Sequence, residues 1–394
     1  MESHGEGFIK RVSHRERILR ALNHCPPDRV PLDFGSHPNA SIHIKAYERL
    51  KSYLGIHAET HLMHRWMQVA VIDERILRYF DIDTRRLPLG NRDKSIERDL
   101  DEFTYIDQWG VIRTKPPGTD YYELKESPLT GEISLSDIMH HNWPDPLDLG
   151  ITRGLRERAL ELRQTTDFAI VVTVPSGFIH YTQFIRGFWD WYLDCASDHR
   201  LFEALADAVL DINIALVWEI MREVGDLIDV VVTADDIGEQ RGTIVSPSTY
   251  LKLIKPRQKR YFDEIHDLTD AKLLFHTCGS VFDILMDLIE IGVDVLNPVQ
   301  VSANKMDTTT LKSMAGDQLA FWGAIDTQKV LPYGSSEDVQ LEVIRRIVDL
   351  GERGGYVLSS VHNIQPEVPP ENVCAMFEAG RQFGTYKGQF HEHA

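Results

Sequence analysis

The chain has 394 residues, of which 43% are hydrophobic and 26% are charged, as in an ordinary globular protein. Its 42 basic and 60 acidic residues give a net charge of −18, which argues against a nucleic-acid or anionic-membrane partner, because such partners require a basic face. No window approaches the ~20 apolar residues of a membrane span, and the charged N-terminus has no apolar segment, so we expect neither a membrane anchor nor a signal peptide.

The first third of the chain predicts helices, two strands and a hairpin. Ser13 and Glu16 form a capping-box pattern that opens a helix ending near residue 23. The apolar run Val30–Gly35 predicts the first strand. The segment 115–118 (KPPG) separates two runs of alternating aromatic and polar residues, which predicts a β-hairpin excursion at about 103–125. Further helices are expected at 46–54 and 69–80, and a second strand at 83–90.

The rest of the chain alternates apolar, β-branched runs with helical patterns. Such runs are typical of strands buried on both faces, and strands that alternate with helices form parallel sheets. Strands are expected at 169–175, 229–235, 272–277, 293–297, 319–323 and 356–360. Helices are expected at 151–165, 181–196, 198–224, 281–290, 307–315, 336–351 and 370–383, with another opened by Ser246 and Pro247. A loop is expected at 134–146 and a frayed polar tail at 387–394.

About eight strand–helix units over this length predict an α/β fold of the (β/α)8 (TIM) barrel type, with an N-terminal helical extension and the hairpin as an insertion. We expect one barrel domain over residues 1–394. The alternative is an open doubly wound sheet, but the chain has no G-x-G-x-x-G after a strand and no Walker loop.

Polar residues are concentrated where the predicted strands end, which is where a barrel of this type carries its functional groups. Asp326 is interpreted mainly as a helix N-cap. Asp235 and Asp236 are interpreted as functional, because no helix starts directly after this pair of carboxylates. The other strand-end residues are Asp33, Ser176, Asn297, Gln300, His362 and Asn363.

His276 and Cys278 stand at the end of the strand predicted at 272–277. Residues two apart on a strand face the same side, so this imidazole and thiol project together, and both are zinc ligands. The alternative is a hydrogen-bonded core histidine beside a small buried cysteine. His362 is the candidate third ligand, because the last strand of a barrel ends on the same rim, and three protein ligands leave one zinc position open, as in a catalytic site. Without a metal, His362 would serve as a general acid or donate a hydrogen bond to an anionic substrate.

Several segments resemble the uroporphyrinogen decarboxylase superfamily. The segment 356–380 (YVLSSVHNIQPEVPPENVCAMFEAG) is similar to the strand of that superfamily that ends in a G-H-G-I or G-C-G-I element followed by P-x-x-P-x-E-N. Together the similar segments cover most of the chain from residue 168 onward, and the resemblance implies a (β/α)8 barrel. The others are IRGFWDWYLD (185–194), TADDIGEQRGTIVSP (233–247), VLNPVQ (295–300) and FWGAIDTQKVLPYG (321–334).

Within this superfamily the chain is more similar to the corrinoid-dependent zinc methyltransferases than to the true decarboxylases. The decarboxylases hold the tetrapyrrole carboxylates with an R-Q-A-G-R type motif, where this chain reads PLDFGSHPNASIH, and they lack the H-x-C-G element. The methyltransferase branch holds zinc with H-x-C and a later cysteine. His276 and Cys278 match that pair, whereas His362 stands in the place of the later cysteine, where the decarboxylases also have histidine.

The resemblance implies a zinc-dependent methyltransferase that moves a methyl group between a small O-, N- or S-methyl compound and a corrinoid (cobalamin). The corrinoid would be carried by a separate partner protein, because the chain has no D-x-H-x-x-G motif. Relatives are often dimers, so a homodimer is a further expectation. Asp235 or Asp236 would orient the substrate or take a proton. Residues expected to contact the substrate are His180, Tyr181, Asn297 and Gln300.

Two other functions compete with this one. A metal-free decarboxylase or related lyase would act on a carboxylated substrate, with His362 and an aspartate as proton donor and anchor. A binding protein without catalytic activity is disfavoured by the density of polar groups at the strand ends. Cys278 and the other three cysteines, which are Cys25, Cys195 and Cys374, form no C-x-x-C pair, so a reduced, cytoplasmic protein is expected in either case.

Overall fold

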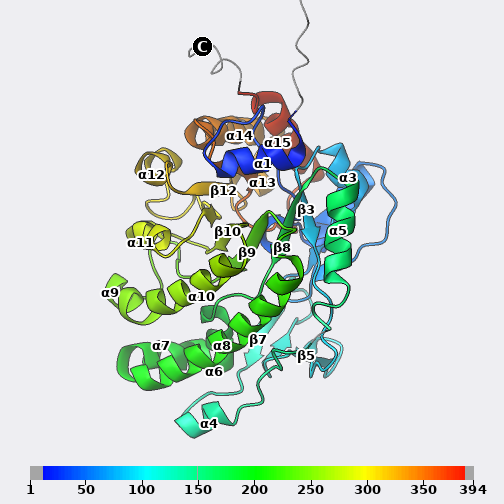
Figure 1. Cartoon of the computed structure of the whole chain (residues 1–394). Coiled ribbons are helices and arrows are strands. Elements are labelled where there is room, and N and C mark those ends of the chain that lie inside the picture. Colours follow the sequence, from blue (N-terminus) through cyan, green and yellow to red (C-terminus); the bar gives the residue numbers. More distant parts are fainter. Residues whose placement is uncertain (1–11, 149, 387–394) are drawn as a thin grey trace, which may run out of the picture.

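A curled parallel sheet surrounded by helices forms the centre of the molecule (Figure 1). The computed structural model describes residues 12–148 and 150–386, so the predicted tail at 387–394 lies outside the described residues. The order of the seven strands is β13-β12-β11-β10-β9-β8-β3, so each strand after β8 pairs with its predecessor in the sheet. The strands are β3 (Thr84–Leu87), β8 (Ala169–Thr173), β9 (Val230–Ala234), β10 (Lys272–His276), β11 (Val295–Asn297), β12 (Ala320–Ile325) and β13 (Tyr356–Ser360).

The helices lie around the outside of this sheet, and α1 lies across one end of it (Figure 1). The capping box predicted at Ser13 is confirmed, because its hydroxyl accepts from the Glu16 N–H while the Glu16 carboxylate accepts from the Ser13 N–H. The N-terminal and connecting helices are α1 (His14–Leu22), α2 (Ile44–Tyr53), α3 (Glu74–Tyr79), α4 (Leu135–Met139) and α5 (Leu155–Thr165). The helices after β8 are α6 (Ile179–Arg186), α7 (Phe188–Ser197), α8 (His199–Val224), α9 (Pro247–Thr249), α10 (Lys255–Leu268), α11 (Leu285–Glu290), α12 (Thr308–Ala315), α13 (Val330–Tyr333), α14 (Ser336–Gly351) and α15 (Pro370–Phe383).

The segment 30–33 closes the sheet into a barrel by lying between its two edge strands. Leu32 forms a parallel bridge with Leu358 on β13, and its carbonyl accepts from the Asp83 N–H, 3.0 Å away, next to β3. The predicted (β/α)8 barrel is therefore confirmed. The expected regular strand at 30–35 is wrong in detail, because Pro31 has no N–H to donate and only the bridge at Leu32 forms.

Two buried carboxylates hold this closing segment. Asp83 accepts hydrogen bonds from the Leu32 N–H at 2.8 Å and from the Arg29 and Arg17 guanidinium groups at 2.8 and 2.5 Å. It thereby ties α1, the closing segment and the start of β3 together. Asp33, which is fully buried, accepts from the Thr84 hydroxyl at 2.5 Å and from the indole N–H of Trp322 on β12 at 2.9 Å.

Apart from Trp322, the barrel interior is filled by small and branched side chains that alternate along the strands, as the pleat requires. Ile18 and Leu22 of α1 belong to the same buried cluster, so α1 plugs the end of the barrel where the strands begin. Leu274 on β10 also belongs to this interior cluster, which places His276, two residues later, on the inward face. The other members are Ala169, Val171, Val230, Val232, Val295, Ala320, Trp322 and Val357.

Residues 103–125 form part of a four-stranded antiparallel sheet, larger than the hairpin expected there. Its order is β4-β5-β6-β7, and the β6–β7 pair, whose connection contains residues 115–118, is the expected hairpin. A second excursion, the antiparallel pair of β1 and β2, was not expected from the sequence. These strands are β1 (Leu62–His64), β2 (Val69–Ala70), β4 (Arg98–Asp99), β5 (Thr104–Ile106), β6 (Ile112–Thr114) and β7 (Glu123–Glu126).

Three further predicted elements need correction. The helix expected at 69–80 is confined to α3, because Asp73 caps it by accepting from the Arg75 N–H. The helix expected at 181–196 is broken into α6 and α7 at Gly187, whose φ of 81° lies in the region that favours glycine. The loop expected at 134–146 contains α4, since Ser134 and Asp137 form a capping box.

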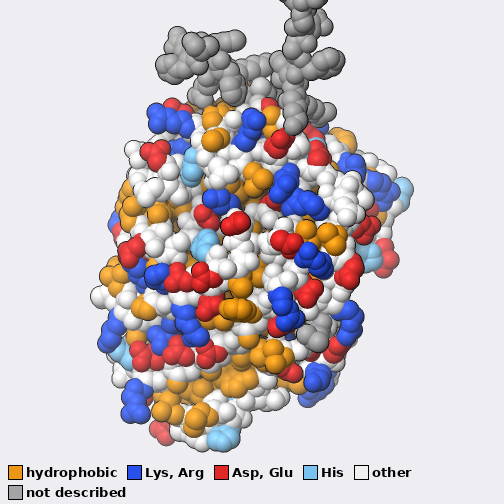
Figure 2. Space-filling model, viewed as in Figure 1, with side chains coloured by type: hydrophobic (Ala, Val, Ile, Leu, Met, Phe, Trp, Pro, Cys, Tyr) orange, Lys and Arg blue, Asp and Glu red, His pale blue; other side chains and the backbone are white. Residues whose placement is uncertain are grey.

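On the face drawn in Figure 2, acidic and basic side chains of the described residues are interspersed. Apolar side chains gather in its lower part, where Figure 1 places α4 and α7. Trp189 and Leu193 of α7 are 80% and 50% exposed, and Met139 of α4 is 70% exposed. Among the described residues, no helix has both the length and the apolar character that crossing a membrane requires.

The closing carboxylate Asp33 predicts a specific dependence of stability on pH. Burial raises its pKa to about 6, from 3.8, although the hydroxyls of Thr84 and Ser36 and the Trp322 N–H oppose this shift. Between pH 3.8 and 6 the Asp33 carboxyl is ionised in the unfolded chain but still protonated in the folded chain, so a rise in pH destabilises the folded state. From pH 4.5 to 7, wild type should lose about 2 kcal/mol of unfolding free energy relative to Asp33→Asn in urea titrations.

The control is Asp307→Asn. Hydrogen bonds from Thr309 and Thr310 lower the pKa of Asp307 to about 2, below this pH window, so the difference between wild type and this variant should stay nearly constant. An equally constant difference for Asp33→Asn would show that Asp33 does not titrate in this way.

Candidate functional site

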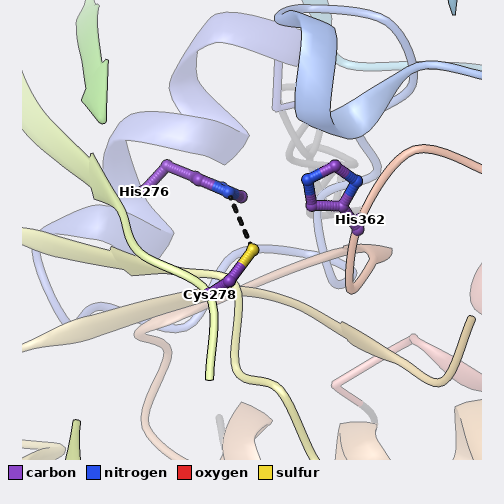
Figure 3. A group of neighbouring side chains, drawn as sticks. All are labelled: His276, Cys278 and His362. Atoms are coloured by element: carbon purple, nitrogen blue, oxygen red, sulfur yellow. Dashed lines mark hydrogen bonds between the residues drawn. The ribbon is translucent and has the colours of Figure 1, made fainter. Parts of the chain in front are cut away.

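His276, Cys278 and His362 meet at the end of the barrel where the strands finish (Figure 3). One ligand atom from each residue lies within 4.8 Å of the other two. Cys278 Sγ is 3.4 Å from His276 Nε2, and Figure 3 shows a ring nitrogen of His362 on the side that faces this pair. His276 is buried, and the other two side chains are half-buried.

Asn297 at the end of β11 sets the orientation of His276. Its Nδ2 donates to the Trp322 carbonyl at 3.0 Å, so its Oδ1 faces His276 Nδ1 at 2.5 Å and accepts the proton of that nitrogen. The Nε2 lone pair of His276 then points toward Cys278. A metal-ligating histidine commonly has its other ring nitrogen fixed by such an acceptor.

Cys278 is held by a tight turn just beyond β10. Its N–H donates to Asp236 Oδ1 at 2.7 Å, and the next N–H, that of Gly279, donates to Gln300 Oε1 at 2.7 Å. Gly279 has a φ of 80°, and a Cβ there would lie 2.4 Å from the Glu239 nitrogen, so this position requires glycine. Burial, together with the Asp236 carboxylate, raises the pKa of the Cys278 thiol well above its ordinary value.

His362 follows β13 and is oriented in the same manner as His276. Its Nδ1 contacts the Oδ1 of Asn363, which leaves the second ring nitrogen free for a ligand. Burial lowers the pKa of His362, and burial with the nearby His362 lowers that of His276 to about 4. Both rings are therefore neutral near pH 7, which is the form that binds a metal.

The three side chains fit a zinc ion. Zinc–sulfur and zinc–nitrogen bonds of about 2.3 and 2.0–2.1 Å at a tetrahedral angle separate the two ligand atoms by about 3.6 Å. The 3.4 Å between Cys278 Sγ and His276 Nε2 is close to that separation. Imidazole nitrogen and thiolate sulfur are both zinc ligands, and a bound cation would offset the cost of ionising the Cys278 thiol.

The two adjacent carboxylates after β9 point to different places. Asp235 is fully buried and accepts from the N–H groups of Phe178 and Ile179, both at 2.9 Å, so it anchors the start of α6. Burial raises the pKa of Asp235 to about 6. Asp236 instead faces the cavity beside the three-residue group and lies 3.2 Å from His180 Nε2. Although burial opposes it, Asp236 raises the pKa of His180, and its own pKa is held low by that imidazole.

A cavity of about 300 Å³ opens beside the three-residue group. Five histidines line it, of which two are the candidate ligands His276 and His362. Among the described residues, the lining carries Asp236 but neither lysine nor arginine. The other polar residues of the lining include His37, His64 and His180, and its apolar and aromatic walls include Trp66, Met67, Val174, Tyr181 and Val232.

The structure brings most of the predicted site residues together, but only some of them line the cavity. His276, His362, His180, Tyr181 and Asp236 line the cavity. Three residues expected to act on the substrate instead have polar atoms that contact the protein. The Asn297 amide contacts His276, the Gln300 amide contacts Gly279, and the Asp235 carboxylate contacts the start of α6. His37, His64 and Trp66 were missed. His37 follows the closing segment, so the expectation that functional groups follow the strand ends could have identified it. No sequence signal marked the β1–β2 excursion, which carries His64 and Trp66.

The orientation of His276 by Asn297 predicts an effect on metal affinity. Asn297→Ala should weaken zinc binding about 10- to 100-fold, because the imidazole loses the acceptor that fixes its ring and tautomer. Competition with a chromophoric chelator measures the zinc affinity of each protein. The control is Asn372→Ala, which removes two hydrogen bonds to the carbonyls of Leu331 and Gly334, and it should bind zinc like wild type. Equal affinities in all three proteins would rule out this role for Asn297.

Comparison with solved structures identifies the same fold. The chain aligns with a methyltransferase from Methanosarcina mazei at a TM-score of 0.67 and 18% identity, over 94% of this chain and 99% of the other. At this identity the similarity concerns the fold.

Comparison with curated sequences and family profiles identifies the family. Uroporphyrinogen decarboxylase from Alkalilimnicola ehrlichii is 33% identical over 81 residues, which are 21% of each chain. The enzyme of that name from Nostoc punctiforme is 24% identical over 139 residues, which are 35% of this chain and 37% of the relative. The matches thus span about a fifth to two fifths of these relatives. The profile described as Uroporphyrinogen decarboxylase (URO-D) matches residues 132–383, which is more than half of the chain. The chain therefore belongs to the uroporphyrinogen decarboxylase family.

Proposed function

We propose that this protein is a zinc-dependent methyltransferase that moves a methyl group between a small O-, N- or S-methyl compound and a corrinoid carried by a separate protein. The observation that carries the proposal is the convergence of His276, Cys278 and His362, with ligand atoms within 4.8 Å, beside a cavity. The similar fold in Methanosarcina mazei is that of a methyltransferase, and the proposal brings this class of reaction to the present chain.

Zinc bound by these residues would act as a Lewis acid and polarise an oxygen, nitrogen or sulfur atom of the small-molecule substrate. The methyl group would move between this atom and the corrinoid. Asn297 and Asn363 fix the two imidazoles, so the three protein ligands are arranged before the metal arrives. Three ligands leave the fourth position for the substrate atom, and the cavity provides the space for the rest of that molecule.

Asp236 and His180 provide the proton acceptor that methylation of an O–H, N–H or S–H group requires. The methyl group replaces the hydrogen of that bond, and the proton must leave the heteroatom. The Asp236 carboxylate lies within hydrogen-bond distance of both His180 Nε2 and the Cys278 N–H, so this pair is fixed beside the proposed metal position. In the reverse direction the same pair would return the proton.

The charges around the cavity disfavour the alternative, a decarboxylase that acts on a polycarboxylated substrate. Such a substrate requires unpaired cationic side chains, and none lines the 300 Å³ cavity among the described residues. One adjoining cavity contains Arg65 and Arg113, but Arg65 pairs with Asp99, and Arg113 pairs with Asp107 at 2.9 Å. A second adjoining cavity contains Arg92, whose guanidinium donates to the Asp145 carbonyl at 2.7 Å.

Metal content tests the first part of the proposal. Protein purified without chelator should contain one zinc per chain, and both Cys278→Ala and His362→Ala should lose it, because each removes one of three ligands. Cys195→Ala, which alters a buried cysteine on α7, is the matched control and should keep the metal. A wild-type protein without stoichiometric zinc would contradict the proposal. So would zinc that persists in Cys278→Ala.

Methyl transfer tests the second part. The zinc-loaded protein should transfer methyl groups to free cob(I)alamin from at least one O-, N- or S-methyl donor, and Cys278→Ala should not. The spectral change from cob(I)alamin to methylcobalamin reports the reaction. Zinc binding without transfer from any donor class would show that the metal site exists but serves other chemistry.

The His180–Asp236 pair predicts a separation of catalysis from metal binding. His180→Gln should reduce the rate of methyl transfer by about 10²- to 10⁴-fold, as expected for the loss of a general acid–base group, while the zinc content stays that of wild type. His43→Gln changes a buried histidine that hydrogen-bonds the Asp120 carbonyl outside the cavity, and it should leave the rate unchanged. A loss of zinc in His180→Gln would instead assign His180 to the metal site.

A further inference from the structure

His37 is a buried histidine of the cavity whose ring nitrogens lack a hydrogen-bond partner in the described part of the chain. It is 0% exposed, and neither Nδ1 nor Nε2 has a hydrogen-bond partner among the described residues. It lines the same cavity as His276 and His362. A buried polar group without a partner is costly, so its presence needs an explanation.

The backbone around His37 is fixed by the contacts that close the barrel. The Ser36 hydroxyl donates to Asp33 at 2.9 Å, and the Gly35 N–H donates to the Ala40 carbonyl at 2.8 Å. Pro38 then begins a 3-10 helix, Pro38–Ala40. These contacts hold the backbone that carries His37 at the wall of the cavity.

The other histidines of the cavity already have partners. His180 pairs with Asp236, and the Nδ1 atoms of His276 and His362 contact the amides of Asn297 and Asn363. His64 Nδ1 accepts from the Met67 N–H at 3.3 Å. His37 is also outside the group whose ligand atoms lie within 4.8 Å of one another, so it is positioned to contact a molecule in the cavity rather than the metal.

The cavity lining indicates which class of molecule this is. Trp66 and Tyr181 provide aromatic walls, which pack well against a flat ring. A neutral imidazole has one N–H donor and one lone pair, which suits a hydroxyl group. Asp236 is paired with His180, and neither lysine nor arginine is among the described residues of the lining, so apart from a metal no unpaired protein charge favours a charged substrate there.

We infer that His37 binds the oxygen of the small-molecule substrate, and that this substrate is an uncharged single-ring aromatic compound with a hydroxyl or ether oxygen. The inference rests on the proposed function in one respect, since it takes the ligand of this cavity to be the methyl donor or acceptor. Binding can nevertheless be measured without methyl transfer.

The test is a phenol titration of the zinc-loaded full chain, read by calorimetry, with wild type, His37→Phe and His43→Gln. Phenol should bind wild type and His43→Gln equally and bind His37→Phe about 10- to 100-fold more weakly, because a hydrogen bond to the buried oxygen is lost. Cyclohexanol, which offers a similar hydroxyl without an aromatic face, should bind wild type more weakly than phenol does.

Thermal unfolding separates recognition from a structural role. His37→Phe should melt at or above the wild-type temperature, because the substitution removes an unpaired buried polar group and keeps an aromatic ring. Equal phenol affinity in wild type and His37→Phe would overturn the inference. So would a wild type that does not bind phenol, or a large destabilisation of His37→Phe. Phenol binding that depends on His37 without methyl transfer would leave this inference standing and contradict the proposed function alone.

Discussion

The closure of the barrel by residues 30–33 is the constraint on which the site depends. This segment forms only one bridge of regular pairing, and two buried carboxylates, Asp33 and Asp83, complete its attachment to the neighbouring elements. Because β13 and β3 are brought together across it, the ends of β10 and β13 lie on one rim, with His37 beside them. Separate parts of the sequence therefore contribute to a single cavity. A weaker closure would move these side chains apart even if every strand survived.

The sequence predicted the parts of the fold that depend on local periodicity. The runs at 169–175, 229–235 and 272–277 are strands as expected, because each is apolar on both faces and has a helix on either side. The proximity of the His276 and Cys278 side chains followed from their two-residue spacing. The position of His362 beside it followed from the convergence of parallel strands. Two local features were not predicted. Gly187 breaks a helix whose apolar pattern continues past it, and α4 is a helix of only five residues, too short for periodicity to reveal.

Site roles beyond the strand ends depend on contacts between distant segments, which one sequence does not reveal. Asp235 and Asp236 are adjacent and chemically identical, yet the first meets the N–H groups that begin α6 and the second meets His180. Their environments separate their pKa values, so one carboxylate serves the fold and the other faces the cavity. Asn297 likewise has the position expected of a substrate-binding residue, but the Trp322 carbonyl turns its amide oxygen toward His276.

The identity of the third ligand bears on which substrate the site suits. Two imidazoles and one thiolate bring one negative charge to a divalent ion, whereas a set with a second thiolate in place of His362 would bring two. Amide oxygens, rather than carboxylates, hold both imidazoles, so they add no further charge. A metal at His276, Cys278 and His362 would therefore be the stronger Lewis acid and would lower the pKa of a bound group further. A hydroxyl needs more of this assistance than a thiol, because its ordinary pKa is higher. The ligand set and the unpartnered ring of His37 thus favour the same kind of substrate atom, an oxygen.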